Sequence, residues 1–327
     1  MKNRYVFIGP TSPMTYHMVS NLFKLEEVKL YREPLKIRIK KFDYIFVHSI
    51  YHLERFFHGI IATKMVYIFC RRKLLEIAAQ NQESIFVYFY PWIGTVASAG
   101  IIDEIRRQYP DIRHIAIFYD IQVMKNHDLA LIKSKYDLVS TYDKREADLA
   151  GVVYIPPVYS KEYSSSNSIN EYYDVFFVGK AKDRLNVLIG VYDKLEADGF
   201  VCRFLIFGVA EKDQLSRSGI TYIKKEISVE DAFQYTCKAK CLLEIVPYNT
   251  SALTGRYREA VIYNKKLLSN NKSVIYDKYY NPKMIQYFES VDQIDTSFLN
   301  SPLMDYNYQD DYEAVTLLKG IEENLKT

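Results

Sequence analysis

The chain contains few of the residues that mark several large protein classes. Its 327 residues include 4 cysteines, 1 tryptophan, 12 glycines and 10 prolines. Four cysteines in so long a chain do not make a disulfide framework, and Cys237 and Cys241 have no second Cys or His pair nearby to complete a zinc site. We therefore expect a reducing compartment, no structural metal and no bound cofactor.

Long apolar runs and strong net charge are also absent. No run approaches 18 apolar residues, and the opening MKNRYVFIGP has too short an apolar stretch for a signal peptide. The net charge of +3 is too small to indicate a nucleic-acid partner. We expect a cytoplasmic protein. Tyrosine is abundant, at 30 residues; sugar-stacking surfaces would use it, but a compositional bias of the source genome explains it more simply.

The composition and length favour a globular protein with two domains. The chain is 49% hydrophobic and 25% charged, and it is longer than a typical single domain. Apolar runs alternate with amphipathic stretches along nearly the whole length, which is typical of βαβ units and parallel sheets. The strands expected in the first half are Tyr5–Ile8, Tyr44–Val47, Ile85–Tyr88, Ile115–Phe118, Leu138–Ser140 and Val153–Ile155, and the helices are Tyr16–Leu25, Tyr51–Thr63, Lys73–Gln80, Val96–Gln108 and Lys144–Leu149.

A serine-rich segment separates this half from a second alternation. Residues 159–173, YSKEYSSSNSINEYY, are polar and weakly patterned, as in an interdomain linker. We therefore expect domains at 1–158 and 174–304, followed by a helical C-terminal segment at 305–327. The second-half strands expected are Asp174–Val178, Cys202–Phe207, Thr221–Ile223, Cys241–Val246 and Lys266–Ser269, and the helices are Arg184–Asp198, Val229–Lys238 and one that begins near Gly255.

The most informative stretch is Leu242–Asn271, LLEIVPYNTSALTGRYREAVIYNKKLLSNN. It predicts a strand, a polar turn, a helix from Gly255 and another strand. A helix that starts directly after a strand directs unpaired N–H groups at an anion, and Arg256 and Arg258 add positive charge there. A phosphate-bearing ligand with a hydroxylated sugar would use these groups; an ordinary α/β turn with a solvated basic face is the alternative.

The second half resembles the donor domain of glycosyltransferases with the two-domain GT-B architecture. Residues 174–208 resemble its opening strand, glycine, basic loop, helix and second strand, and residues 266–271 resemble its "Lys-Pro-Val-Ile" strand. The element Arg258-Glu259-Ala260 matches the family's "leucine–glutamate–alanine" element. The resemblance implies an α/β fold of two Rossmann-like domains facing a cleft, with the C-terminal helix packed back on the N-terminal domain. It also implies that Glu259 binds the donor ribose.

The sequence departs from the family at one position. Many retaining members have a second glutamate eight residues before the ribose glutamate, where this chain has Ser251. With Thr250 and Thr254, Ser251 forms a hydroxyl-rich turn that suits phosphate oxygens. Displacing a nucleoside phosphate builds negative charge on the leaving group, which cationic side chains stabilise without a metal. The candidates for donor binding are Lys180, Arg184, Thr250, Ser251, Thr254, Gly255, Arg256 and Glu259; for Lys180 and Arg184 a solvated loop is the alternative.

An inverting transfer needs a general base from the first domain. Asp120 is the first candidate because it ends the apolar run IAIFYD, His17 follows the first strand, and His48 ends the strand YIFVHS. For each of the three, a structural or lining role is the alternative. Tyr90 and Trp92 end another strand and would stack on an acceptor sugar, with core packing as the alternative for Trp92.

These observations predict transfer of a sugar from a nucleotide sugar to a glycan or lipid-linked acceptor, as in bacterial surface polysaccharide or lipopolysaccharide assembly. An epimerase or hydrolase of the same fold and a non-catalytic glycan-binding relative are the rivals. A nicotinamide dehydrogenase is disfavoured because GPTSPM lacks the Gly-X-Gly-X-X-Gly spacing. The basic runs Lys36–Lys41 and Arg71–Lys73 would bring the protein peripherally to the anionic inner face of the membrane, or they form a solvated face.

Overall fold

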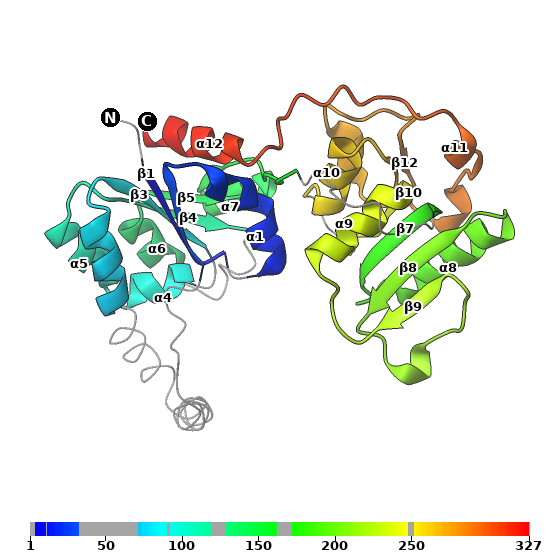
Figure 1. The fold of residues 1–327 in the computed structure, drawn as a ribbon, viewed down its shortest axis with the longest axis horizontal. Coiled ribbons are helices and arrows are strands. Elements are labelled where there is room, and N and C mark those ends of the chain that lie inside the picture. The colour runs from blue at the N-terminus through cyan, green and yellow to red at the C-terminus, as the bar shows by residue number, and fades with distance from the viewer. Residues whose placement is uncertain are drawn as a thin grey trace. The chain divides into compact units, whose positions relative to one another are not determined.

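The computed structural model describes residues 4–10, 12–32, 71–89, 92–119, 128–161, 172–247 and 252–326. The chain divides into two compact units (Figure 1). Unit 1 comprises Met1–Val158 and Ala314–Thr327, and unit 2 comprises Tyr159–Glu313. Each unit contains a six-stranded sheet in which the neighbouring strands pair in parallel. This confirms the predicted α/β fold of two Rossmann-like domains.

The sheet of unit 1 has the strand order β2-β1-β3-β4-β5-β6. Its strands are β1 (Arg4–Ile8), β2 (Val28–Tyr31), β3 (Ser84–Phe89), β4 (Arg113–Phe118), β5 (Leu138–Thr141) and β6 (Val153–Tyr154). Its helices are α1 (Pro13–Val19), η1 (Ser20–Lys24), residues 71–80, α4 (Trp92–Ser98), α5 (Ile101–Gln108), α6 (Leu129–Lys135) and α7 (Lys144–Ala150). The chain order reverses between β1 and β3, which makes this the switch point of the described strands.

Alternate residues of the unit 1 strands enter two separate cores. Val6, Phe86 and Ala116 pack on the face that carries α4, α5 and α6. Phe7 and Val87 pack on the opposite face with the first helical segment and the C-terminal helix. Both faces of the sheet are therefore buried, which explains why these strands read as continuous apolar runs rather than as alternating ones.

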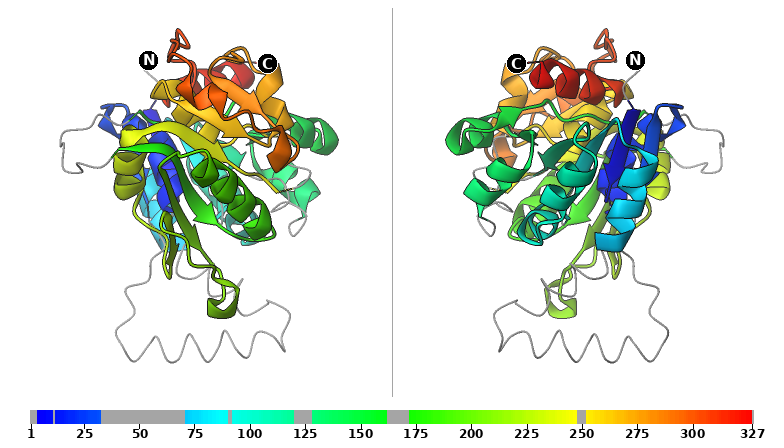
Figure 2. Two further views of the ribbon diagram at one scale, coloured as in Figure 1. Left: turned by 90° about the vertical axis from the view of Figure 1, so that its right-hand side faces the viewer. Right: turned by 90° about the vertical axis from the view of Figure 1, so that its left-hand side faces the viewer.

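The C-terminal helix α12 (Val315–Leu325) belongs to unit 1 (Figures 1 and 2). Its Leu317 and Ile321 are fully buried in the second of these cores, and the Tyr5 hydroxyl donates to Glu322 at 2.6 Å. This helix is shorter than the predicted segment 305–327, because residues 305–313 are irregular and belong to unit 2. Asn307 and Asp310 have φ angles of 52° and 58°, in the left-handed region that an α-helix does not contain.

The sheet of unit 2 has the order β12-β11-β10-β7-β8-β9. Its strands are β7 (Tyr173–Lys180), β8 (Cys202–Phe207), β9 (Ile220–Ile223), β10 (Ala239–Glu244), β11 (Lys266–Ser269) and β12 (Ile285–Tyr287). Its helices are α8 (Leu185–Ala197), η3 (Glu211–Asp213), α9 (Val229–Lys238), α10 (Gly255–Ile262), η4 (Lys272–Tyr276), η5 (Val291–Gln293) and α11 (Ser297–Asn300). The chain winds outward from β7 to β9 and then returns beside β7 to wind the other way. This is the Rossmann strand order, with its switch point between β7 and β10.

One divided helix and two additional strands differ from expectation. The helix predicted at Val96–Gln108 is two helices, α4 and α5, because Gly100 between them adopts a φ of 68°. The short strands β2 and β12 were not predicted. The strand predicted at Tyr44–Val47 and the helix predicted at Tyr51–Thr63 lie outside the described residues.

Candidate functional site

The switch point of unit 2 is the natural place for a ligand in this fold, because the loops after β7 and β10 diverge there. β7 ends at Lys180 and β10 ends at Glu244, and helix α10 follows β10. Lys180 and Thr254, two of the predicted donor-binding residues, therefore lie at this edge.

Thr254 is the N-cap of α10. Its backbone is extended, and its hydroxyl oxygen accepts from the backbone N–H groups of Arg256 at 3.1 Å and Tyr257 at 3.4 Å. The same hydroxyl donates to Glu244 at the end of β10. The helix therefore begins where the sequence predicted, but two of its first N–H groups are already satisfied by the protein.

Glu244, the last residue of β10, also lies at this edge and was not predicted from the sequence. It is 3% exposed, and its second carboxylate oxygen accepts from the hydroxyl of Ser269 in β11. Burial raises the pKa of Glu244, and the hydrogen bonds from Ser269 and Thr254 oppose that rise. One buried carboxyl group thus joins β10, β11 and the start of α10. The signal for it was a charged residue at the end of the apolar run LLE.

We expect Thr254→Val to lower the free energy of unfolding by about 1–2 kcal/mol, the usual cost of losing an N-cap. The substitution also removes the hydroxyl that donates a hydrogen bond to Glu244, and it leaves a buried carboxyl oxygen unsatisfied. Urea unfolding measures the effect. Thr254→Ser keeps the hydroxyl and is the matched control; equal stability of the serine and valine variants would contradict the capping role.

Arg256 and Glu259 form an ion pair on α10. Arg256 Nη1 donates to Glu259 Oε2 at 2.5 Å and to Thr236 Oγ1 at 3.3 Å, and the guanidinium lies 5.6 Å from the ring centre of Phe176 in β7. Among the described residues, Arg256 Nε and Nη2 have no hydrogen-bond acceptor. The guanidinium is thus held through Nη1, and its Nε and Nη2 are left to donate hydrogen bonds to an anion.

Glu259 is 8% exposed and has a second partner that the sequence analysis did not identify. The Tyr159 hydroxyl donates to Glu259 Oε1 at 2.5 Å, and burial raises the pKa of Tyr159 well above its ordinary value, so the hydroxyl remains a donor. Tyr159 also donates its backbone N–H to Tyr312 O at 2.7 Å. A residue expected to open the linker is therefore buried against the candidate site.

Arg258 lies in the interior of unit 2 and does not add charge to this edge. It is 3% exposed, donates from Nη1 to Leu253 O at 2.8 Å, and lies 5.5 Å from the ring centre of Tyr312. Its neighbour on the helix, Arg256, is therefore the cation of α10 that remains for a ligand.

The two cations of the β7 loop differ in availability. Arg184 donates to the carbonyl oxygens of Lys180, the last residue of β7, and Ile245, the residue after β10, on either side of the switch point. It therefore joins the ends of these two strands, and its burial lowers its pKa. Lys180 is exposed, its aliphatic stem packs over Gly208, and its ammonium has no partner among the described residues.

In unit 1 the structure places His17 and Trp92 but not the other candidates. His17 is 5% exposed within α1. Trp92 begins α4 and covers Gly9 at the end of β1, where a Cβ would lie 1.9 Å from the indole ring. Trp92 therefore packs at the switch point of unit 1. The remaining candidates, Asp120, His48, Tyr90, Thr250 and Ser251, lie outside the described residues.

The basic runs proposed for membrane contact are only partly described. Arg71 pairs with Glu104, and Arg72 and Lys73 both pair with Glu76, at 3.1 and 3.5 Å. Carboxylates therefore offset the charge of this run, and Lys36–Lys41 lies outside the described residues. No helix in the described ranges is both long and apolar enough to cross a membrane.

Comparison with known proteins gives the fold. No protein-family model and no curated protein matches the sequence. A trehalose-6-phosphate synthase has a TM-score of 0.54 at 10% identity, covering 98% of this chain and 96% of that chain. A UDP-N-acetylglucosamine 2-epimerase has a TM-score of 0.53 at 11% identity, covering 99% and 96%. The catalytic domain of starch synthase IV from Arabidopsis thaliana has a TM-score of 0.52 at 8% identity, covering 80% and 77%. The chain is therefore similar to these enzymes in its GT-B fold.

Proposed function

We propose that this chain binds a nucleotide sugar at the switch point of unit 2 and transfers the sugar to a glycan or lipid-linked acceptor of surface polysaccharide synthesis, without a metal ion. The observation that carries the proposal is the Arg256–Glu259 pair on α10, with Thr254 fixing the start of the helix. The enzymes of similar fold support it, because the starch synthase was solved with ADP and acarbose and the epimerase is named for a UDP-sugar.

The chemistry follows from the charges at this edge. Breaking the bond between an anomeric carbon and a nucleoside diphosphate leaves negative charge on the phosphate. Arg256 and Lys180 stabilise that charge, and preorganised cations do so without reorganisation at the moment of reaction. Glu259 uses one lone pair on each oxygen for Tyr159 and Arg256, which leaves lone pairs for ribose hydroxyls. Asp120 remains our first candidate for the acceptor base, before His17 and His48.

A second function has independent support. The epimerase reading is favoured by the UDP-N-acetylglucosamine 2-epimerase among the similar folds. An epimerase or hydrolase of this kind uses the same nucleotide site but needs no acceptor. The two functions therefore differ in acceptor dependence and not in donor binding.

The test is a panel of UDP, GDP, ADP and CMP sugars. We expect one nucleotide class to raise the melting temperature, since a ligand at 100 times its Kd stabilises the native state by about 2.7 kcal/mol. Nuclear magnetic resonance then follows the sugar with and without acceptor glycans. Acceptor-dependent release of nucleotide supports transfer, and a change at the sugar without acceptor supports the epimerase. If no nucleotide stabilises the protein, the proposal fails.

We expect Glu259→Gln to weaken nucleotide binding by about 10- to 150-fold, because a hydrogen bond to a charged group contributes roughly 1.5–3 kcal/mol. Isothermal titration with the stabilising nucleotide measures the change. Tyr159→Phe is the matched control: it removes one donor from the carboxylate but keeps the charge, so affinity should be retained or improved. Equal losses in both variants would indicate a structural role for Glu259.

A further inference from the structure

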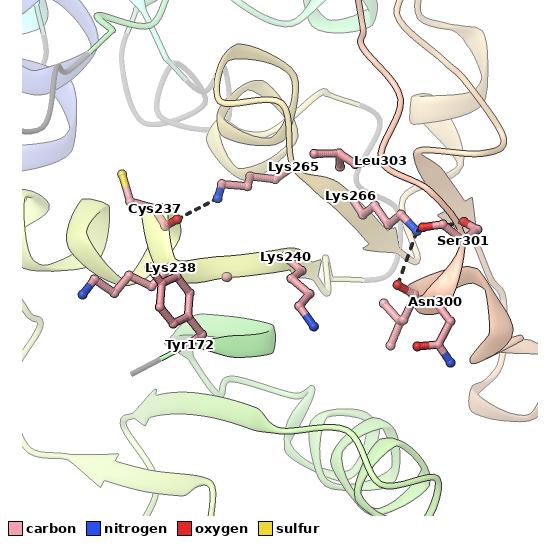
Figure 3. A pocket seen from close by; sticks show the side chains of 11 residues that line it. Tyr172, Cys237, Lys238, Lys240, Lys265, Lys266, Asn300, Ser301 and Leu303 are labelled. Atoms are coloured by element: carbon pink, nitrogen blue, oxygen red, sulfur yellow. Dashed lines mark hydrogen bonds between the residues drawn. The ribbon is translucent and has the colours of Figure 1, made fainter. Parts of the chain in front are cut away.

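Unit 2 has a pocket at the opposite edge of its sheet from the nucleotide site just proposed. Its volume is about 450 Å³, and Figure 3 shows the side chains that line it. It is lined where β10 and β11 begin, at Ala239 and Lys266, whereas the proposed nucleotide site lies where β7 and β10 end. The full lining is Tyr172, Cys237, Lys238, Ala239, Lys240, Lys265, Lys266, Leu299, Asn300, Ser301 and Leu303.

Four of these lining residues are lysines, and none is acidic. Two of the lysines are held by neutral groups. Lys266 is 2% exposed and donates to Phe298 O, Ser301 O and Ser301 Oγ, and Lys265 donates to Cys237 O at 2.7 Å. Burial lowers the pKa of both amines. Lys266 is therefore buried and Lys265 half-buried beside the pocket, and no carboxylate of the described residues pairs with either ammonium.

The other two lysines make an ion pair and an aromatic contact. Lys240 pairs with Asp174 at 2.7 Å while its side chain stays 68% exposed, and Lys238 lies 5.8 Å from the ring centre of Tyr172. Figure 3 shows Lys238 beside Tyr172 and places Lys240 between that pair and Asn300. Within the described residues, Asp174 is the one carboxylate that pairs with a lysine of this pocket. The pocket therefore carries an excess of positive charge.

We propose that this pocket binds a phosphate ester. Phosphate is multiply charged and accepts several hydrogen bonds, which suits the ammonium groups of Lys238 and Lys240 with the Asn300 amide beside them. The charges of the half-buried Lys265 and the buried Lys266 add attraction without direct contact. At the rim, Tyr172 is 75% exposed and Leu303 is 57% exposed, which suits an apolar or aromatic group attached to the phosphate. A soluble phosphate ester and a phospholipid headgroup share this chemistry.

Lysine labelling tests this pocket independently of the nucleotide site. The full-length protein is treated briefly with acetic anhydride, with and without pyrophosphate, and each lysine is quantified by mass spectrometry. We expect pyrophosphate to slow modification of Lys238 and Lys240 at least threefold. The exposed Lys212 and Lys283 should be unchanged, and Lys180 reports the nucleotide site independently. Anionic phosphatidylglycerol vesicles replace pyrophosphate in a second arm, with phosphatidylcholine vesicles as their control.

A charge-matched pair of variants completes the test. Lys238→Gln with Lys240→Gln removes two charges from the pocket, and Lys212→Gln with Lys283→Gln removes two from exposed sites elsewhere in unit 2. We expect the first variant to bind pyrophosphate or anionic vesicles at least tenfold more weakly and the second to bind as the wild type does. Protection by pyrophosphate alone identifies a soluble ester, and protection by vesicles alone identifies a headgroup. Equal effects in the two variants, or no protection by either probe, would overturn the proposal whether or not the nucleotide site is real.

Discussion

Arg256→Ala is expected to lower kcat/KM for the nucleotide-sugar donor by two to three orders of magnitude. Removing one preorganised donor from a site of developing negative charge typically costs that much. In this chain the effect is favoured by the position of Arg256, whose guanidinium is fixed by Glu259, Thr236 and the ring of Phe176. A side chain already held in its working position loses little conformational entropy when the ligand arrives.

Arg256→Lys separates charge from geometry. Lysine keeps the positive charge but cannot pair with Glu259 and Thr236 while also presenting a planar fork to a phosphate. We expect this variant to recover binding of the nucleotide only partly and to remain at least tenfold slower than the wild type. Steady-state kinetics with the donor identified by thermal shift gives both values.

Arg217→Ala is the matched control for this experiment. Arg217 forms a bidentate pair with Asp193 in unit 2, at 2.6 and 3.2 Å, but the pair is exposed and such pairs contribute little to stability. Its loss should leave kcat/KM within about twofold. If Arg217→Ala slows the enzyme as much as Arg256→Ala does, or if Arg256→Ala keeps full activity, then Arg256 does not stabilise the leaving group.

The strands of unit 2 were predictable because local sequence and tertiary packing agree there. β8 has its predicted bounds, Cys202–Phe207, and α9 has its predicted bounds, Val229–Lys238, with the Ser228 side chain capping its start. Segments 305–313 and 96–108 were mispredicted for opposite reasons. Tyr312 continues the helical spacing of Val315 and Leu318 but is buried in unit 2, whereas Gly100 breaks a pattern that otherwise continues.

The site was predictable only where its residues are close in sequence. Thr254, Arg256 and Glu259 share one turn and the helix after it, so a strand followed by a capped helix was enough to suggest them. Glu244 and Tyr159 were missed because their partners lie 10 and 100 residues away. No local pattern states that a tyrosine at the end of a proline-containing loop donates to a helix glutamate. The same limit applies to the lysine pocket, which brings together β10, β11 and residues 299–303.

His114 gives the second large expected effect, a loss of stability in acid. It is fully buried in β4, with its Nδ1 3.1 Å from the Tyr88 hydroxyl and its ring stacked on Tyr88. Burial lowers the pKa of His114 to about 3, with help from the charge of Arg106 and against the charge of Asp137. The native state therefore holds this imidazole neutral at every pH at which the protein is expected to work.

The direction of the effect follows from where each state takes up its proton. Above the ordinary histidine pKa of about 6.5, His114 is neutral in both states and adds no pH dependence. As the pH falls from there towards 3, the unfolded chain binds a proton that the native state refuses, so stability is lost. The shift corresponds to a loss of about 4–5 kcal/mol from this one group.

His114→Gln isolates the contribution of His114 to the pH dependence of stability, because glutamine stays neutral and still offers a hydrogen-bond acceptor to Tyr88. Urea unfolding at pH 8, pH 6 and pH 4 compares the two proteins. Carboxylates protonate in both proteins alike, so the difference between the two pH profiles reports His114. We expect the variant to be less stable than the wild type at pH 8, owing to imperfect packing, and to close or reverse that gap by pH 4. Parallel profiles would mean that His114 becomes charged in the native state and that the core of unit 1 admits water or a counter-charge beside its central strands.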